Sequence, residues 1–174
     1  HSGNMIKSLG DGWLIEFNSA SNAVNCALEW QEISKRQGQL ALRVGIHLGD
    51  VEHEEGPPPD VYGDTVNIAA RLESIAEQGD VAISTSAYLC LDQNQAKVFN
   101  NCGKQTLKNI ATPVEVWSTG RLNVGSKGMD RKTDGPAIAV KPFVGSNETV
   151  ATFATDVTND LQKYLNQKDW IDSL

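Results

Sequence analysis

The sequence predicts an α+β domain, in which helices cover a mixed β-sheet, and three observations support this. Residues 4–9 and 13–17 are two strand-like runs around a Gly-Asp-Gly turn, which is typical of a hairpin. Apolar residues recur at helical spacing in residues 19–37 and again after Asp64. Short apolar or alternating runs, typical of strands, separate and follow these helices. Strands and helices therefore mix along one chain.

The composition fits one full domain with room for part of a second. The chain has 174 residues, 40% of them hydrophobic, which suffices for a sizeable core. Its formal net charge of -7 argues against broad binding to nucleic acids or membrane surfaces, since both favour basic patches. No apolar run approaches the ~20 residues that a membrane-spanning helix needs. No signal peptide opens the sequence.

The three cysteines show neither metal-ligand spacing nor an even-numbered disulfide framework. Cys26 and Cys90 lie among apolar neighbours, which predicts two small core residues. This usage of cysteine predicts a reducing compartment, and we therefore expect a cytoplasmic protein.

Further elements are predicted between and after the two main helices. The helix over residues 19–37 is amphipathic, and we assign it a structural role only. Gly38 ends it. Later strands are predicted over residues 40–47, 80–84, 97–101 and 113–117, and another helix begins within residues 84–91.

The stretch from Asp60 to Glu73, DVYGDTVNIAARLE, changes from loop to helix. Gly63 and Asp64 form a turn and an N-terminal cap, and one apolar face of the helix packs on a core. Asn67 and Arg71 lie four residues apart and share a different face. An amide and an always-charged guanidinium, one turn apart, suit a phosphate or a developing oxyanion. From the helix alone, a solvated face with a surface arginine is the simpler interpretation.

Two further stretches complete a pattern with this helix. They are MIKSLGDGWLIEF, residues 5–17, and LRVGIHLGDV, residues 42–51. Together, the three stretches resemble the class III nucleotidyl cyclase catalytic domain, the family of adenylate and guanylate cyclases. The resemblance covers about residues 4–118. It implies a ferredoxin-like βαββαβ core, which in this chain lacks its first strand and helices.

The resemblance implies roles for four residues around a nucleotide. Lys7 and Asp60 match the pair that hydrogen-bonds the purine base. A lysine with an aspartate fits adenine, because the aspartate accepts from the exocyclic amine and the lysine donates to a ring nitrogen. Family members that prefer guanine carry a glutamate and a cysteine there, so ATP is the expected substrate. Asn67 would orient the ribose, and Arg71 would stabilise the charge that builds on the α-phosphate.

The resemblance also implies metal and triphosphate contacts. Asp11 matches the second of two metal-binding aspartates, which would bind Mg²⁺ or Mn²⁺; its alternative is a turn residue, because Asp-Gly favours turns for local reasons. Arg43 matches a triphosphate contact. Lys108 lies where the family often places a triphosphate lysine, although KQTLKNI departs from the usual glycine-bearing motif. Arg43 and Lys108 are otherwise exposed surface cations.

Two limits on activity follow from the same resemblance. The first metal aspartate of the family lies on the first strand, which would precede His1, so we expect this fragment to bind metal poorly and to be inactive by itself. The base and ribose residues serve one half of the family's site, whereas Asp11 and Arg43 serve the other. Since each family site forms between two domains placed head to tail, a homodimer is expected.

The composition shifts after residue 118. Residues 119–135 are rich in Gly, Ser, Asn, Asp and Lys, which predicts a linker. PAIAVKPF, residues 136–143, then begins a buried strand. Residues 136–174 resemble the start of the TolB-like domain that often follows a cyclase domain in bacterial multidomain proteins. The predicted organisation is a cyclase domain over 1–118, a linker, and the start of a second domain.

The predicted function is therefore that of an adenylate cyclase. The ribose 3′-hydroxyl of ATP would attack the α-phosphate, with two metal ions per site, and give cyclic AMP and pyrophosphate. A rival interpretation is a non-catalytic module that dimerises and binds nucleotide to transmit a signal. A phosphate-binding ferredoxin-like domain is a third, but it leaves Lys7 and Asp60 without a role. The chain carries each family residue that it is long enough to show, which favours the enzyme.

Overall fold

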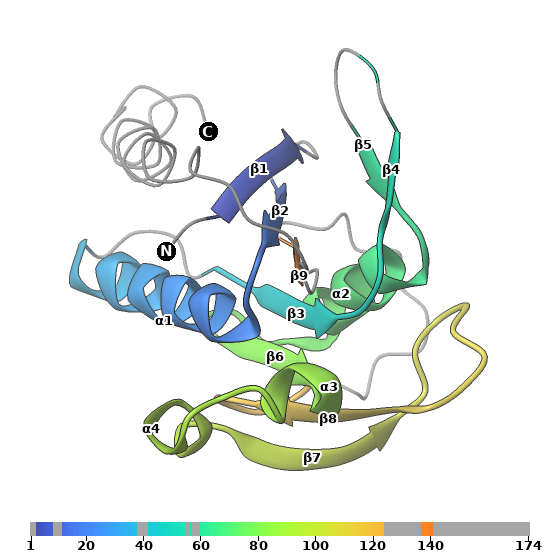
Figure 1. Cartoon of the computed structure of the whole chain (residues 1–174). Helices are drawn as coiled ribbons and strands as arrows, with labels where there is room; N and C mark the ends of the chain where they lie inside the picture. The colour runs from blue at the N-terminus through green and yellow to red at the C-terminus, as the bar shows by residue number, and fades with distance from the viewer. Residues whose placement is uncertain are drawn as a thin grey trace, which may run out of the picture.

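The structure is a computed structural model that describes residues 3–8, 12–37, 42–54, 56, 60–123 and 137–140. Figure 1 shows the arrangement of its helices and strands. In chain order they are β1 Gly3–Ser8, β2 Trp13–Phe17, α1 Ala20–Gln37, β3 Val44–Leu48, β4 Glu52–Glu54, β5 Asp60–Tyr62, α2 Asp64–Ile75, β6 Val81–Ser84, α3 Thr85–Tyr88, α4 Gln93–Ala96, β7 Asn100–Gln105, β8 Val114–Ser118 and β9 Ala137–Val140.

A mixed seven-stranded sheet forms the centre of the fold, with the strand order β1-β2-β9-β3-β6-β8-β7. The four strands β2, β9, β3 and β6 run parallel to one another, and antiparallel partners flank them on both sides. A separate antiparallel ribbon, β4–β5, leads into α2 (Figure 1). The predicted α+β fold with a mixed sheet is confirmed.

The two long helices cover opposite faces of the sheet. On β6, Val81 and Ile83 belong to the buried cluster that contains the α1 side chains, whereas Ala82 between them belongs to a cluster with α2. On β2, Ile15 lies on the α1 side and Leu14 on the α2 side. Successive strand residues point to opposite faces of the sheet. Because helices cover both faces, every central strand must be apolar on both faces.

Gly45 lets α2 lie directly against the sheet. A Cβ at this position would overlap the carbonyl oxygen of Ala69 and the amide nitrogen of Glu73, which are both backbone atoms of α2. Its neighbours Val44 and Ile46 are fully buried on the α1 side. The absence of a side chain at Gly45 therefore sets the depth at which α2 sits, and with it the position of the residues that α2 carries.

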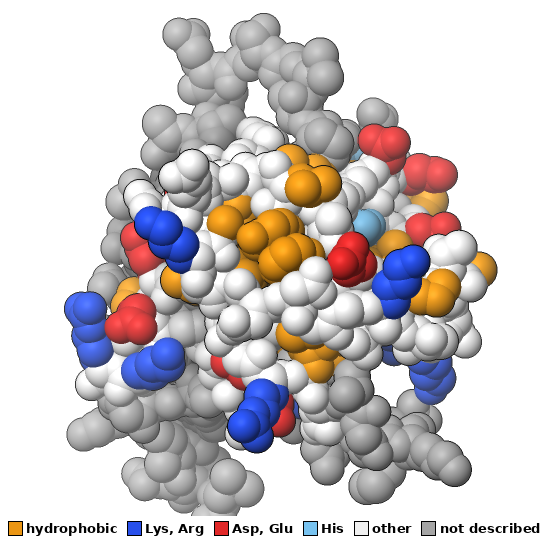
Figure 2. All heavy atoms as spheres, turned by 90° about the horizontal axis from the view of Figure 1, so that it is seen from below, with side chains coloured by type: hydrophobic (Ala, Val, Ile, Leu, Met, Phe, Trp, Pro, Cys, Tyr) orange, Lys and Arg blue, Asp and Glu red, His pale blue; other side chains and the backbone are white. Residues whose placement is uncertain are grey.

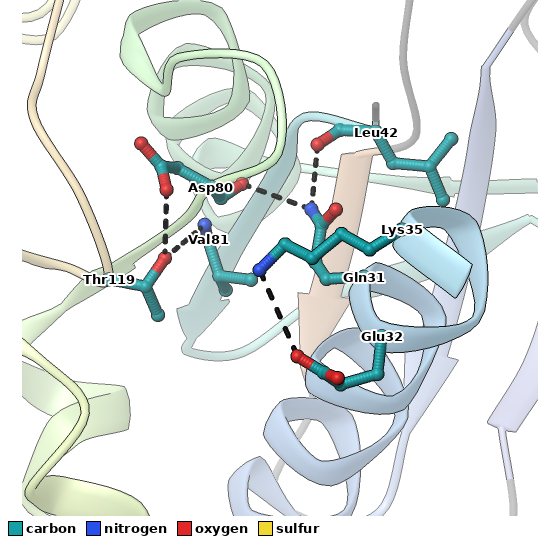
Figure 3. A network of polar contacts seen from close by, with 7 residues as sticks. All are labelled: Gln31, Glu32, Lys35, Leu42, Asp80, Val81 and Thr119. Carbon is teal, nitrogen blue, oxygen red and sulfur yellow. Dashed lines mark hydrogen bonds and ion pairs between the residues drawn. The ribbon is translucent and has the colours of Figure 1, made fainter. Parts of the chain in front are cut away.

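A polar network fixes α1 to the ends of three strands (Figure 3). Gln31 donates from Nε2 to the carbonyl oxygens of Leu42, at 2.6 Å, and Asp80, at 3.4 Å. Thr119 Oγ1 accepts a hydrogen bond from the backbone N–H of Val81 at 2.9 Å and donates one to Asp80 Oδ1 at 3.4 Å. Burial raises the pKa of the Asp80 carboxyl, and the Thr119 hydrogen bond opposes that rise. Backbone groups at the starts of β3 and β6 thereby obtain partners.

Two predictions around α3 and α4 were wrong in detail. The helix predicted to begin within residues 84–91 is present as α3, but it ends at Tyr88, so Cys90 lies in the following turn and is exposed rather than buried. The strand predicted from residue 97 begins at Asn100. Asp92 is the reason, because it forms a capping box with Gln95 and starts the short helix α4. Cys26 is buried as predicted, and burial raises the pKa of its thiol to about 12.

The surface seen from below in Figure 2 carries hydrophobic side chains near its centre, with charged side chains around them. Leu89 and Val98, in the turns after α3 and α4, are two of the large hydrophobic residues that the described chain exposes. No described helix combines the length and the apolar composition that crossing a membrane requires.

Within the segment 136–143, for which a strand was predicted, residues Ala137–Val140 form β9. It lies inside the cyclase sheet, between β2 and β3. Residues 124–136, most of the predicted linker, and residues 141–174 lie outside the described residues. The linker, the TolB-like domain and the absence of a first strand and helices therefore stay predictions.

Replacing Gly45 with alanine should destabilise the fold by about 1–3 kcal/mol, because the added methyl group forces α2 away from β3. Urea unfolding followed by circular dichroism measures this change. Ser74→Ala, on the exposed side of α2, is the control and should change the unfolding free energy by less than ~0.5 kcal/mol. Equal midpoints for Gly45→Ala and the unsubstituted chain would show that α2 does not depend on this contact.

Candidate active site

Lys7 and Asp60 form an ion pair across 53 residues of sequence. Lys7 Nζ lies 2.6 Å from Asp60 Oδ1 and 2.7 Å from Oδ2. Lys7 projects from β1 and Asp60 begins β5, so the pair joins the hairpin to the ribbon that precedes α2. Both side chains keep about a third of their surface exposed, at 34% and 36%. The two side chains are therefore in contact and reachable from solvent, and their role in binding a base stays a prediction.

The Asp60 carboxylate is held in one orientation. Its Oδ1 also accepts the backbone N–H of Val61 at 2.7 Å. The hydrogen bond from Lys7 is the largest cause that lowers the pKa of Asp60, so the carboxylate is charged at neutral pH. A carboxylate offers about four lone-pair sites and an ammonium three donors. The pair therefore retains an acceptor at Asp60 and a donor at Lys7 for a ligand.

Asn67 and Arg71 lie on α2, one turn apart as predicted. Asn67 is exposed and Arg71 is half-buried. Within the described residues, neither side chain makes a hydrogen bond or an ion pair. α2 starts at Asp64, with Gly63 at φ 122° as its N-cap, so Asn67 lies in the first helical turn and close in sequence to Asp60. The helix presents an amide and a guanidinium on its solvent-facing side.

Arg43 has a partner that the sequence did not indicate. Its Nε donates to Oε1 of Glu73 at 2.9 Å, and the side chains are only 14% and 1% exposed. Glu73 follows Ala69 and precedes Ala76 at core-facing helical spacing, which was the available signal that it is buried. The pair joins the start of β3 to α2. The triphosphate contact of Arg43 stays a prediction beside this structural role.

The remaining predicted site residues are less informative. Asp11 lies outside the described residues. Lys108 is exposed, in the turn between β7 and β8. No group of three His, Cys, Asp or Glu side chains within the described ranges is arranged to hold a metal ion. The metal and triphosphate roles of Asp11 and Lys108 therefore stay predictions.

His47, which received no catalytic role from the sequence, belongs to a polar cluster under α3. Its Nδ1 lies 2.8 Å from Ser84 Oγ, and Ser86 Oγ donates to the Leu48 carbonyl oxygen at 3.0 Å. Burial lowers the pKa of His47 to about 4, so the ring is neutral near pH 7. The cluster connects β3 to β6 and α3, which is a structural role.

The family model for the adenylate and guanylate cyclase catalytic domain matches residues 3–119. The chain belongs to this family, and it contains a nucleotidyl cyclase domain.

One curated relative is similar over most of the chain. It is the putative adenylate cyclase 3 of Rhizobium meliloti strain 1021, 33% identical over 177 residues. The match covers 92% of this chain and 30% of the relative, so this chain spans less than a third of that protein. The family match covers residues 3–119, which are 117 of the 174 residues. The similarity to the Rhizobium protein covers 92% of the chain and therefore continues past the cyclase region.

Solved structures show the same fold. An adenylate/guanylate cyclase/hydrolase from Silicibacter pomeroyi is 37% identical, with a TM-score of 0.58, over 67% of this chain and 71% of that one. Adenylate cyclases from Trypanosoma brucei, solved in their monomeric state, have a TM-score of 0.52 over 74% of this chain and 77% of theirs. At 24% identity, the latter supports the fold alone.

Replacing Glu73 with alanine should lower the free energy of unfolding by about 3–5 kcal/mol, because it leaves the Arg43 guanidinium largely buried without its partner. Chemical denaturation measures the loss. Glu32→Ala is the matched control, since Glu32 and Lys35 lie 3.8 Å apart and are 59% and 64% exposed. It should change stability by less than ~1 kcal/mol. Equal losses for the two variants would contradict the structural role of Glu73.

Replacing Lys7 with methionine should raise the pKa of Asp60 toward its ordinary value, because the main cause of its depression is removed. Titration of the carboxyl carbon by NMR measures this. A depressed pKa gives stability that is present above the unfolded value of ~3.9 and lost as the pH falls through the folded value. The stability that the protein loses at acidic pH should therefore be smaller in Lys7→Met. An unchanged Asp60 titration would contradict the pair, and Lys35→Met serves as the control without effect.

Proposed function

We propose that this domain is an adenylate cyclase, which converts ATP to cyclic AMP and pyrophosphate. The observation that carries the proposal is the Lys7–Asp60 pair, preformed at 2.6 Å and partly exposed beside the helix that bears Asn67 and Arg71. Family membership supports a nucleotide substrate. The relative named as a putative adenylate cyclase supports the choice of ATP.

Base selection follows from the groups that the pair leaves available. Adenine carries an amine donor at its 6-position, whereas guanine carries a carbonyl acceptor there. With Asp60 opposite the 6-position, its carboxylate accepts from the adenine amine, and Lys7 donates to the neighbouring ring nitrogen. Guanine would place its carbonyl oxygen against the Asp60 carboxylate. Two acceptors facing each other are repulsive and leave a desolvated group without a partner.

Asn67 and Arg71 act on the sugar and the phosphate. The Asn67 amide hydrogen-bonds the ribose and orients the 3′-hydroxyl toward the α-phosphate. As the 3′-oxygen attacks and pyrophosphate departs, negative charge builds on the α-phosphate oxygens. The Arg71 guanidinium, which is always protonated, donates hydrogen bonds to them. A donor aimed at developing charge stabilises the transition state more than the ground state.

The metal ions and the dimer belong to the same proposal. Mg²⁺ or Mn²⁺, two per site, would lower the pKa of the 3′-hydroxyl and balance the triphosphate charge, with Asp11 as one ligand. Within the described residues, no group of His, Cys, Asp or Glu side chains forms a metal cage by itself. A homodimer would let Asp11 and Arg43 of one copy face the base-binding residues of the other.

Arg71→Ala should lower kcat for cyclic AMP formation about 10²- to 10³-fold, since one transition-state donor is lost. The assay follows cyclic AMP from ATP, with Mn²⁺, in the full-length protein that the gene encodes. Asn67→Ala should lower kcat as well. Lys97→Ala, which removes an exposed charge next to α4, should leave kcat unchanged.

One outcome of this assay would favour the rival interpretation. If the folded, dimeric full-length protein bound ATP but formed no cyclic nucleotide from ATP or GTP, the enzyme proposal would be wrong. The domain would then be a regulatory module that binds nucleotide without converting it.

A further inference from the structure

One face of the hairpin β1–β2 lies toward the ribbon β4–β5. Lys7 opposes Leu14 in the pairing of β1 with β2, and Glu16 follows two residues later on β2, so the three side chains point to the same side of the sheet. Leu14 shares a buried hydrophobic cluster with Val61 of β5 and Ala69 of α2. The hairpin therefore meets the ribbon on the face that α2 covers.

Glu16 contacts His53 of the ribbon on this face. Its Oε1 lies 3.4 Å from His53 Nε2, and the two side chains are 15% and 43% exposed. His53 opposes Val61 in the pairing of β4 with β5, so both lie on the same side of the ribbon. A charged group on a central strand needs a partner, because burial removes its hydration. His53 supplies a partner to Glu16 from the ribbon that carries Asp60.

This contact lies close to the residues that the proposed function assigns to the base. The Asp60 carboxylate accepts the backbone N–H of Val61 at 2.7 Å and a hydrogen bond from Lys7 at 2.7 Å. A shift of the ribbon relative to the hairpin would move Asp60 but not Lys7, and an exposed ion pair resists such a shift only weakly. The contact between Glu16 and His53 joins the same two elements and opposes the shift.

We propose that Glu16 and His53 are positioning residues for base binding. Their contact holds the ribbon β4–β5 against the hairpin β1–β2 in the place where Asp60 meets Lys7. The consequence for the nucleotide rests on the proposed function, because only there does the Lys7–Asp60 pair bind a base. The contact between the hairpin and the ribbon does not depend on that function.

The test breaks the contact from either side, in the full-length protein, and then replaces it by an apolar contact. Glu16→Leu and His53→Leu each remove one partner, and the double variant restores packing without charge. The pKa of the Asp60 carboxyl, followed by NMR, reports on its pair with Lys7, because the Lys7 hydrogen bond is the main cause of its depression. This pKa should rise toward its ordinary value in each single variant and fall back in the double variant.

The direction of the change separates positioning from the effect of charge alone. Removing the negative charge of Glu16 would by itself lower the pKa of Asp60, since a like charge nearby raises the pKa of a carboxyl. A rise in Glu16→Leu therefore requires that the pair with Lys7 has loosened. Glu52→Gln removes an exposed carboxylate from the same ribbon and, as the control, should not raise this pKa. A lower or unchanged Asp60 pKa in Glu16→Leu would overturn the proposal.

Amide hydrogen exchange measures the position of the ribbon independently of charge. Exchange in β4 and β5 should become about 5-fold faster or more in the single variants, with little change in β6 and β8. His53→Leu alone decides this readout if Glu16→Leu does not fold, because His53 is the more exposed partner. Unchanged exchange of the ribbon in His53→Leu would show that the contact does not hold it, and the proposal would be wrong.

The kinetic readout connects the contact to the nucleotide. KM for ATP should rise about 3- to 10-fold in each single variant, with kcat within about 2-fold, because base contacts act equally in the ground state and the transition state. An unchanged KM in a variant whose Asp60 pKa has risen would contradict the link to base binding. If the protein forms no cyclic AMP, the proposed function fails, whereas the pKa and exchange measurements still decide whether Glu16 and His53 position Asp60.

Discussion

The close packing of α2 against β3 is the constraint on which the candidate site depends. The absence of a side chain at Gly45 lets the backbone of α2 reach the sheet, and the Arg43–Glu73 pair holds the helix there. A buried pair of this kind adds little net stability over apolar packing, but it is costly to break, so it fixes one arrangement. Asn67 and Arg71 project from a helix whose depth and rotation are both set.

The Lys7–Asp60 pair adds a second constraint, which spans separate parts of the fold. Lys7 depends on the hairpin β1–β2, and Asp60 on the ribbon β4–β5 and the start of α2. An exposed ion pair is too weak to hold these parts together by itself. The β-sheet holds them together, and the ion pair can form only when the two parts are correctly placed. A base-binding site built in this way requires an intact sheet.

Much of the fold could be predicted from the sequence, because its signals are local. The hairpin, α1 and the exposed face of α2 follow from hydrophobic periodicity and turn chemistry. The motif predicted that Lys7 and Asp60 bind a base together; the two side chains lie in contact, and the base-binding role stays a prediction. Three features could not be obtained in this way. The pairing of Arg43 with Glu73 depends on how α2 packs on β3, the exposure of Cys90 on where α3 ends, and the place of β9 on strand pairing between distant segments.

The most direct test of the account is the nucleotide selectivity of Asp60→Asn, measured as the ratio of kcat/KM for ATP to that for GTP. An asparagine amide can donate to the 6-carbonyl of guanine, which the carboxylate of Asp60 cannot do. The account predicts that the unsubstituted full-length protein prefers ATP, and that the substitution lowers the ratio about 10-fold or more. A ratio that is the same in both proteins would contradict the claim that the Lys7–Asp60 pair binds the base.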